Sequence, residues 1–388
     1  MAADPVRSEP GAPAGGPRGD ATGDVVLSID AMGGDRGMAA VIQGMGKSLQ
    51  KNTRLRFILH GNAEEIRRTI RTGSKLEART EVRHADGVIA MDDKPSKALR
   101  RAQGTSMWSA LEAVKSGESP VVISCGNTGA LMALSMFALR KAPGIDRPAI
   151  AVLWPSLNPS GYNVVLDAGA DIRADARDLV KFALMGTSYA RNALGLTRPR
   201  VGLLNVGTEE HKGRTELHEA AALIAEAAAA GDFEYVGYVE GSDMPSQRVD
   251  VIVTDGFTGN VALKTAEGTA RMVRGLLKEV FSYSILSRIG ALFALTSLRR
   301  LQKRIDPRRV NGGVFLGLNG TVIKSHGSAD ATGISAAIKL GFTLADSGFT
   351  ERLARRVAVL PADQDADQDA DPHPAPGRGS SPEPEVPA

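Results

Sequence analysis

Apolar, β-branched runs alternate with helix-like stretches along most of this chain, and five of the runs end in a polar turn that contains glycine. Short apolar runs bounded by such turns are typical of strands, and strands that alternate with helices predict a mainly parallel, helix-covered sheet. The predicted strands are residues 25–30, 56–60, 121–124, 149–153, 163–167, 200–205, 235–238 and 249–254. The pattern therefore predicts an α/β fold.

The turns at the strand ends are the first candidates for function, because ligands of open α/β sheets bind beyond the carboxyl ends of the strands. Five of these turns combine glycine with polar side chains: residues 30–35, 124–129, 167–170, 205–209 and 255–260. We expect all five to lie at the same edge of the sheet. The sequence thus predicts a single site assembled from several turns.

The clearest of these turns lies in the segment PVVISCGNTGALMALSMFALRK, residues 120–141. A strand leads into a tight loop and then a helix, whose first-turn amides have no partners within the helix. Such amides, together with the helix dipole, favour an anion, and glycines let the backbone approach a ligand closely. The candidate ligands are Gly126, Asn127, Thr128 and Gly129. The alternative is an ordinary glycine-rich turn.

The two ends of the 388-residue chain differ in composition from its middle. Residues 1–23 and 361–388 consist largely of Ala, Gly, Pro and charged residues, and we expect them to be disordered tails. Residues 24–360 are long enough to form one folded domain with a large core. The N-terminal segment lacks the apolar run of a signal peptide, which predicts a cytoplasmic protein.

Composition argues against several classes of protein. The single cysteine, Cys125, permits neither an intrachain disulfide nor a cysteine-based metal site. A formal net charge of +3 is too small to indicate nucleic acid binding. His211 and His218 lie among glutamates but lack the second histidine of an HExxH motif, so we expect a charged surface there and no metal site.

Residues 271–309 are at once apolar and basic. The uncharged stretch 289–298 is too short to span a bilayer, which takes roughly 20 residues. Apolar side chains flanked by arginines are instead typical of a helical segment that lies on an anionic membrane. The predicted membrane contacts are Ile289, Leu292, Phe293, Arg299 and Arg300.

The apolar positions of this segment drift around the helix, which favours two short helices joined near residues 296–297 over one continuous helix. The alternative to membrane contact is a dimer interface or a buried helical hairpin. Both uses are compatible if the tip of a hairpin projects from a dimer.

Several motifs in fixed order resemble the phosphate acyltransferase family of bacterial phospholipid synthesis. They are IDAMGGD, ISCGNTGALM, RPAIAV, LDAGA, VGLLNVGTEEHKG, VTDGFTGNVALKTAEG and NGGVFLGLNG followed by SHGSADATG. Together they extend over about residues 25–345, which makes the resemblance specific although each motif alone is weak. Cys125 departs from the family pattern, in which alanine is expected.

The resemblance implies a Rossmann-like α/β/α sandwich similar in outline to isopropylmalate dehydrogenases and phosphate acetyltransferases. It implies that residues 24–360 are a catalytic domain that moves a long acyl group from acyl-[acyl-carrier-protein] to inorganic phosphate. The product, acyl phosphate, feeds phosphatidic acid synthesis. The implied partners are acyl carrier protein, a second copy of the chain, the inner face of the cell membrane and the downstream glycerol-3-phosphate acyltransferase; no cofactor is implied.

Attack of phosphate on a thioester requires a site for the dianion, stabilisation of the oxyanion and protonation of the leaving thiolate. Lys264 and Lys212 follow glycine-rich turns and are candidate cations, the alternative being solvated surface lysines. His326 is the candidate general acid because its pKa is ordinarily near neutrality, although a structural histidine fits the sequence equally well. The remaining candidates are Asn260 and Thr258 as donors to the carbonyl oxygen, and Asp30 and Asp255 as carboxylates that orient lysines or cap helices.

Other mechanisms and functions remain open on the sequence. Cys125 suggests a covalent acyl-cysteine route, but direct attack by bound phosphate is simpler. The enzyme alternatives are a phosphate acetyltransferase-like protein that uses short acyl-CoA, and a nicotinamide-dependent dehydrogenase. The latter is disfavoured because IDAMGGD stands where GxGxxG is expected. A non-catalytic membrane scaffold is the third alternative.

Overall fold

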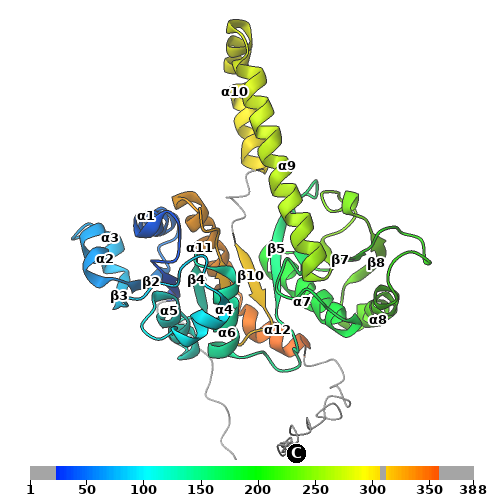
Figure 1. Ribbon diagram of the computed structural model, residues 1–388, viewed down its shortest axis with the longest axis horizontal. Helices are drawn as coiled ribbons and strands as arrows, with labels where there is room; N and C mark the ends of the chain where they lie inside the picture. Colours follow the sequence, from blue (N-terminus) through cyan, green and yellow to red (C-terminus); the bar gives the residue numbers. More distant parts are fainter. Residues whose placement is uncertain (1–22, 306–311, 358–388) are drawn as a thin grey trace, which may run out of the picture.

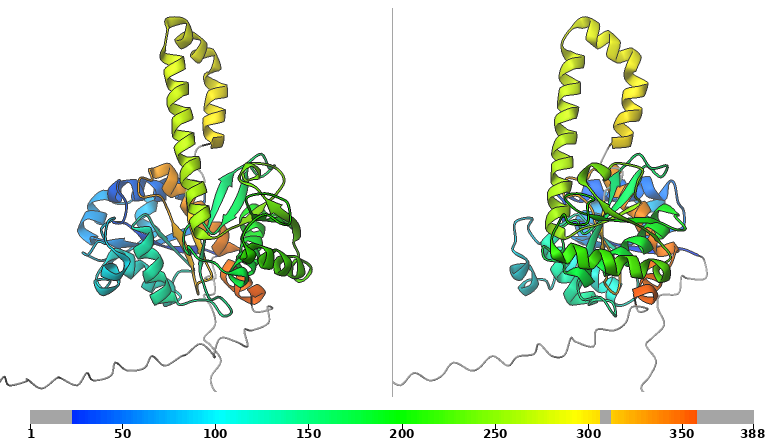
Figure 2. Two further views of the ribbon diagram at one scale, coloured as in Figure 1. Left: turned by 45° about the vertical axis from the view of Figure 1, so that its right-hand side comes forward. Right: turned by 90° about the vertical axis from the view of Figure 1, so that its right-hand side faces the viewer.

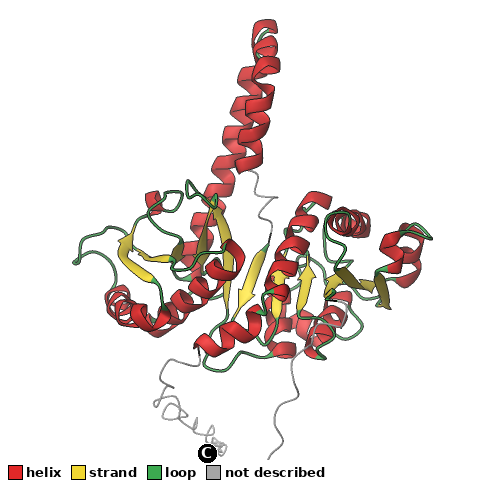
Figure 3. Ribbon diagram, turned by 180° about the vertical axis from the view of Figure 1, so that it is seen from behind, coloured by secondary structure: helices red, strands yellow, loops and turns green. Residues whose placement is uncertain are grey.

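The computed structural model describes residues 23–305 and 312–357. Apart from Gly23, the two predicted tails lie outside the described residues. Helices lie on both faces of a central sheet, as Figures 1 and 3 show, so the predicted α/β/α sandwich is confirmed.

The sheet has eleven strands in the order β3-β2-β1-β4-β11-β10-β5-β6-β9-β7-β8. All eight predicted strands are present, with ends that shift by a few residues. Their bounds are β1 Val25–Asp30, β2 Leu55–Gly61, β4 Val121–Ser124, β5 Ala149–Pro155, β6 Tyr162–Leu166, β7 Arg200–Leu204, β8 Glu234–Val239 and β9 Val251–Val253. The prediction missed β3 Thr80–His84, β10 Gly313–Leu316 and β11 Thr321–Lys324.

The missed hairpin β10–β11 lies in the middle of the sheet and changes its topology. β11 is parallel to β4, but β10 is antiparallel to both β11 and β5, and β5 is antiparallel to β6. Strands β6 to β9 therefore run opposite to β1 to β4. The expectation that five turns share one edge is wrong, because the turns after β1 and β4 lie at one edge and those after β6, β7 and β9 at the other.

Alternation along the strands builds a core on each face of the sheet. In β4, Val121 and Ile123 pack in the core that includes Met45 of α1 and Ile334 of α11, whereas Val122 faces the core beneath α5 and α6. The helices are α1 Gly37–Leu49, α2 Ala63–Thr69, α3 Lys75–Ala78, α4 Pro95–Arg100, α5 Ser106–Lys115, α6 Thr128–Leu139, α7 Ala176–Leu194, α8 Thr215–Gly231, α9 Gly256–Ser282, α10 Ile285–Ile305, α11 Ala331–Asp346 and α12 Phe349–Val357.

Helices α9 and α10 form an antiparallel hairpin that projects far from the body (Figures 1 and 2). The predicted break near residues 296–297 is wrong, because α10 continues through them and the chain reverses at Tyr283 and Ser284 instead. The Ser284 hydroxyl accepts a hydrogen bond from the Ser287 amide at 3.1 Å, which caps the new helix at the reversal. Thr296 and Ser297 have lower helix propensity than leucine or arginine, but the difference is too small to end a helix whose neighbouring residues favour it.

The hairpin exposes large apolar side chains, among them Leu292 at 70% and Phe293 at 86% relative exposure. The side chains of Arg299 and Arg300 lie outside the described residues, although α10 includes both positions. Within residues 23–305 and 312–357, no helix has both the length and the apolar character needed to cross a bilayer.

Candidate active site

Three loops at one edge of the sheet pack tightly against one another. They follow β1, β4 and β11 and consist of residues 30–35, 124–129 and 325–330. A Cβ atom at Gly33 would lie 2.7 Å from the Gly126 amide nitrogen, so the first two loops meet only because both positions are glycine. The third loop joins them because the Asp35 amide donates to the Gly327 carbonyl at 2.8 Å.

The carboxylate of Asp30 holds the first two loops together from below. It is buried and accepts hydrogen bonds from the hydroxyls of Ser106 and Ser124, both at 2.7 Å, and from the Met32 amide. The Ser124 hydroxyl in turn accepts from the Gly126 amide at 3.0 Å. Asp30, predicted to bind substrate, is therefore placed to organise the loops beneath the site.

The predicted anion loop keeps two of its amides available. Asn127 caps α6, because its Oδ1 accepts from the Ala130 amide at 3.0 Å, and its Nδ2 donates to the carbonyls of Met91 and Asp93. Thr128 and Gly129 form the exposed first turn of α6, and their amides have no hydrogen-bond partner among the described residues. Of the predicted anion loop, the part suited to bind an anion is therefore the N-terminus of α6.

Lys324 is a cation at this edge that the sequence analysis missed. It ends β11, and its Nζ donates to the carbonyl of Ser325 and lies 3.4 Å from that of Cys125. Burial lowers the pKa of Lys324, although the charges of Asp35 and Asp30 act in the opposite direction. In the sequence, Lys324 ends the short apolar run TVIK. It could be recognised as a site residue only after the structure showed that this run is a central strand.

Helix α9 brings a second group of polar side chains to the same edge. Glu267 binds Lys264 Nζ at 3.1 Å and lies 3.4 Å from His326 Nε2 of the loop after β11. Partial burial by itself raises the pKa of Glu267, but Lys264 and His326 outweigh it and the pKa is lowered. The charge of Lys264 also contributes to lowering the pKa of Lys324. Glu267, which was not predicted, therefore lies between Lys264 and His326, the two side chains predicted to be catalytic.

Asn260 lies one helical turn before Lys264 on α9, so the two side chains share a face of the helix. Asn260 itself packs against Gly169 of the turn after β6, at the opposite edge of the sheet, where a Cβ atom of Gly169 would lie 3.4 Å from its side chain. That edge also holds other predicted residues. The Asp255 carboxylate caps α9 by accepting from the Thr258 amide at 2.7 Å, and it pairs with Arg214 at 2.6 Å. Lys212 pairs with Glu209 in the turn after β7. Within this chain, Asp255, Thr258 and Lys212 are not brought to the loop after β4.

Cys125 lies in the loop after β4 but is poorly suited to act as a nucleophile. Its side chain is buried, and burial raises the pKa of the thiol to about 11 despite the opposing effects of Ser325 and Lys324. The thiol is therefore protonated near neutral pH.

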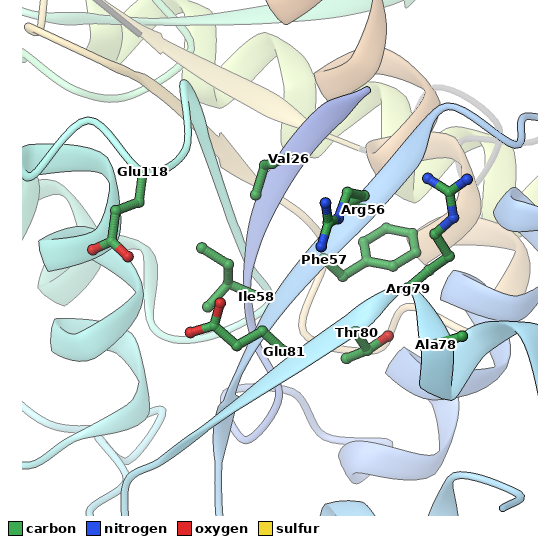
Figure 4. Close-up of a pocket in the computed structure, with 9 residues that line it drawn as sticks. All are labelled: Val26, Arg56, Phe57, Ile58, Ala78, Arg79, Thr80, Glu81 and Glu118. Atoms are coloured by element: carbon green, nitrogen blue, oxygen red, sulfur yellow. The ribbon is translucent and has the colours of Figure 1, made fainter. Parts of the chain in front are cut away.

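Two further observations bear on the site. No cluster of three or more metal-ligating side chains occurs among the described residues. A hollow of about 530 Å³ lies elsewhere, at the amino ends of β1, β2 and β3, where Arg56, Thr80 and Glu81 line it (Figure 4). The hollow and the three loops lie at opposite ends of these strands. We therefore do not assign the active site to the hollow.

The fold is an α/β sandwich of the class found in phosphotransacetylases. The chain is similar to a phosphotransacetylase from Streptococcus pyogenes, with a TM-score of 0.55, 16% identity, and coverage of 83% of this chain and 94% of that one. It is also similar to the EutD phosphotransacetylase from Staphylococcus aureus, with a TM-score of 0.53, 14% identity, and coverage of 84% and 94%. At these identities the likeness establishes the fold alone.

Other relatives share much higher sequence identity with the chain. Residues 25–352 match the model of the fatty acid synthesis protein family. A phosphate acyltransferase from Paracoccus denitrificans is 67% identical over 343 residues, which cover 88% of this chain and 93% of the relative. One from Ruegeria pomeroyi is 65% identical over 340 residues, which cover 88% and 92%. The chain belongs to this family, and the resemblance noted in its motifs is confirmed.

Proposed function

We propose that this protein is a phosphate acyltransferase that moves a long acyl group from acyl-[acyl-carrier-protein] to inorganic phosphate. The observation that carries the proposal is the 67% identity to a phosphate acyltransferase across nearly the whole folded domain. The meeting of the α6 N-terminus with Lys324, Lys264 and His326 at one edge supports it. The product is an acyl phosphate for phosphatidic acid synthesis.

The proposed reaction is a single displacement. Phosphate binds at the amides of Thr128 and Gly129, with Lys324 and Lys264 as neighbouring cations. A phosphate oxygen attacks the thioester carbon, the new C–O bond forms and the C–S bond breaks. The leaving thiolate takes a proton from His326. Asn260 lies on the α9 face that carries Lys264 and is the proposed donor to the carbonyl oxygen.

The donor is the test of the proposed function. Purified protein supplied with phosphate and palmitoyl-[acyl-carrier-protein] should release free carrier thiol and form acyl phosphate, which hydroxylamine traps. Acetyl-CoA and palmitoyl-CoA should be much poorer donors. Turnover of acetyl-CoA that exceeds turnover of the carrier-bound substrate would instead establish a phosphate acetyltransferase, and no acyl phosphate from any donor would refute both.

The phosphate site is tested at Thr128, which is exposed in the first turn of α6. Thr128→Glu should raise the KM for phosphate by at least about tenfold, because the carboxylate occupies the position where the helix dipole favours an anion. The fold should tolerate it, since acidic residues stabilise a helix N-terminus. Thr128→Gln, similar in size but neutral, should change the KM much less. Equal phosphate KM values for the two variants would refute this site.

The catalytic roles are tested with single variants. Lys264→Ala and His326→Ala should each lower kcat by about 10² or more if they act in the transition state, without loss of the folded state. Cys125→Ala serves as the control and should retain nearly full activity, since the buried thiol is protonated. Loss of activity in that control, with an acyl-enzyme trapped on wild-type protein, would establish covalent catalysis instead.

The hairpin is the proposed membrane contact. Apolar residues at its tip and along α10, including Tyr283 and Phe293, are exposed, and exposed apolar surface of this kind marks interaction sites. An acyl phosphate with a long chain is poorly suited to diffusion through water, and release at the cytoplasmic face of the membrane brings it to the downstream glycerol-3-phosphate acyltransferase. Exposed Met272 and Leu276 on the outer half of α9 are the proposed homodimer contact.

Two double variants separate these uses of the hairpin. Leu292→Glu with Phe293→Glu should abolish binding to anionic liposomes and leave turnover in solution and the dimer intact, because both side chains point into solvent. Met272→Glu with Leu276→Glu should give a monomer in sedimentation. If the first variant unfolds or becomes monomeric, the tip is core or dimer interface and the membrane proposal fails.

A further inference from the structure

Residues 88–104 form an excursion of the chain beside the site, here called the strap. Its two ends are joined at the base, because the Gly87 amide donates to the Gly104 carbonyl and the Ser106 amide to the Gly87 carbonyl, both at 3.0 Å. The strap carries α4, and Ile89, Ala98 and Ala102 anchor it in the core. The right-hand view of Figure 2 shows it at the side of the body, away from the hairpin tip.

The strap is fixed to the loops of the site. Asn127 Nδ2 donates to the strap carbonyls of Met91 at 2.9 Å and Asp93 at 2.8 Å. Pro95 lies within 3.1 Å of where a Cβ of Gly129 would be, and the Met91 methyl within 2.9 Å of where one of Gly327 would be. The strap therefore borders both the α6 N-terminus and the loop that carries His326. A substrate that enters at this edge passes next to it.

The outer surface of the strap is basic with apolar side chains between the charges. Lys94, Lys97, Arg100 and Arg101 are exposed within eight residues, against the two acidic residues Asp92 and Asp93. Asp93 is already paired with Lys97 at 2.5 Å, so the other three cations dominate the surface. Met91 and Leu99 are also exposed, at 47% and 39%. Charged residues around exposed apolar ones are typical of a protein-binding surface.

We infer that the strap is the docking surface for an acidic face of the carrier protein that delivers the acyl thioester. The inference rests on the proposed acyl transfer from acyl carrier protein, because a thioester carried by a protein must reach the loops from a surface close to them. Charge complementarity selects an acidic partner and raises its rate of encounter.

An anionic membrane is the competing occupant, and the geometry disfavours it. Sixteen residues of α9 separate Glu267, beside His326, from Tyr283 at the hairpin tip, which at 1.5 Å per residue is about 24 Å. A membrane held at the tip leaves the strap well below it. That space suits a small carrier protein between the membrane and the site.

The test is a charge-reversal variant, Lys94→Glu with Arg100→Glu and Arg101→Glu. The KM for palmitoyl-[acyl-carrier-protein] should rise about tenfold or more, as three exposed ion pairs each contribute a factor of about two to five. The phosphate KM and the kcat at saturating donor should stay near wild type. The matched control, Arg67→Glu with Arg68→Glu and Arg71→Glu, reverses three exposed charges on and just beyond α2 and should leave the donor KM unchanged.

Two binding measurements do not depend on turnover, and the first of them uses only the wild-type protein. Binding of holo acyl carrier protein to wild type, followed by calorimetry, should weaken as salt rises and should be lost in the strap variant alone. Equal carrier affinity in wild type and a folded strap variant, salt-insensitive binding, or loss of liposome binding in place of carrier binding would each overturn the inference. Carrier binding without acyl phosphate formation would refute the proposed function while supporting the docking surface.

Discussion

The contact between the backbones of Gly33 and Gly126 is the constraint on which the site depends. Without Cβ atoms, the loops after β1 and β4 lie against each other, and the Asp30 carboxylate beneath them binds the hydroxyls that hold this arrangement. A larger residue at either position would separate the loops. Separation of the loops would move the α6 N-terminus away from Lys324 and from the loop that carries His326.

Helix α9 connects that site to the most exposed part of the molecule. Its first half packs on the sheet and presents Lys264 and Glu267 to His326, and its second half leaves the body as one arm of the hairpin. An uninterrupted helix is stiff over this length because every turn is hydrogen-bonded to the next. The proposed membrane contact at the tip and the Glu267 side chain beside His326 therefore belong to the same helix.

The three surfaces proposed to bind phosphate, the carrier protein and the membrane differ in their chemistry. The α6 amides suit a small anion, the strap presents charge to a protein, and the apolar tip of the hairpin suits a lipid phase. Such a division fits a reaction whose donor is carried by a protein, whose acceptor is an ion and whose product belongs in a membrane. Separate surfaces allow each partner to be bound by the interaction that is strongest for it.

Local sequence determined the strands whose apolar runs are short and bounded by glycine, and the loop after β4, since these follow from patterns within a few residues. The tertiary structure alone decided which turns meet. The antiparallel pairing of β5 with β6 reverses the direction of the strands beyond it and sends Lys212, Asp255 and Thr258 to the far edge. The hairpin β10–β11, whose runs are too short and too rich in glycine to be predicted, inserts two strands between β4 and β5. Lys324 and Glu267 were missed for the same reason, because a side chain becomes part of a site through neighbours that are distant in the chain.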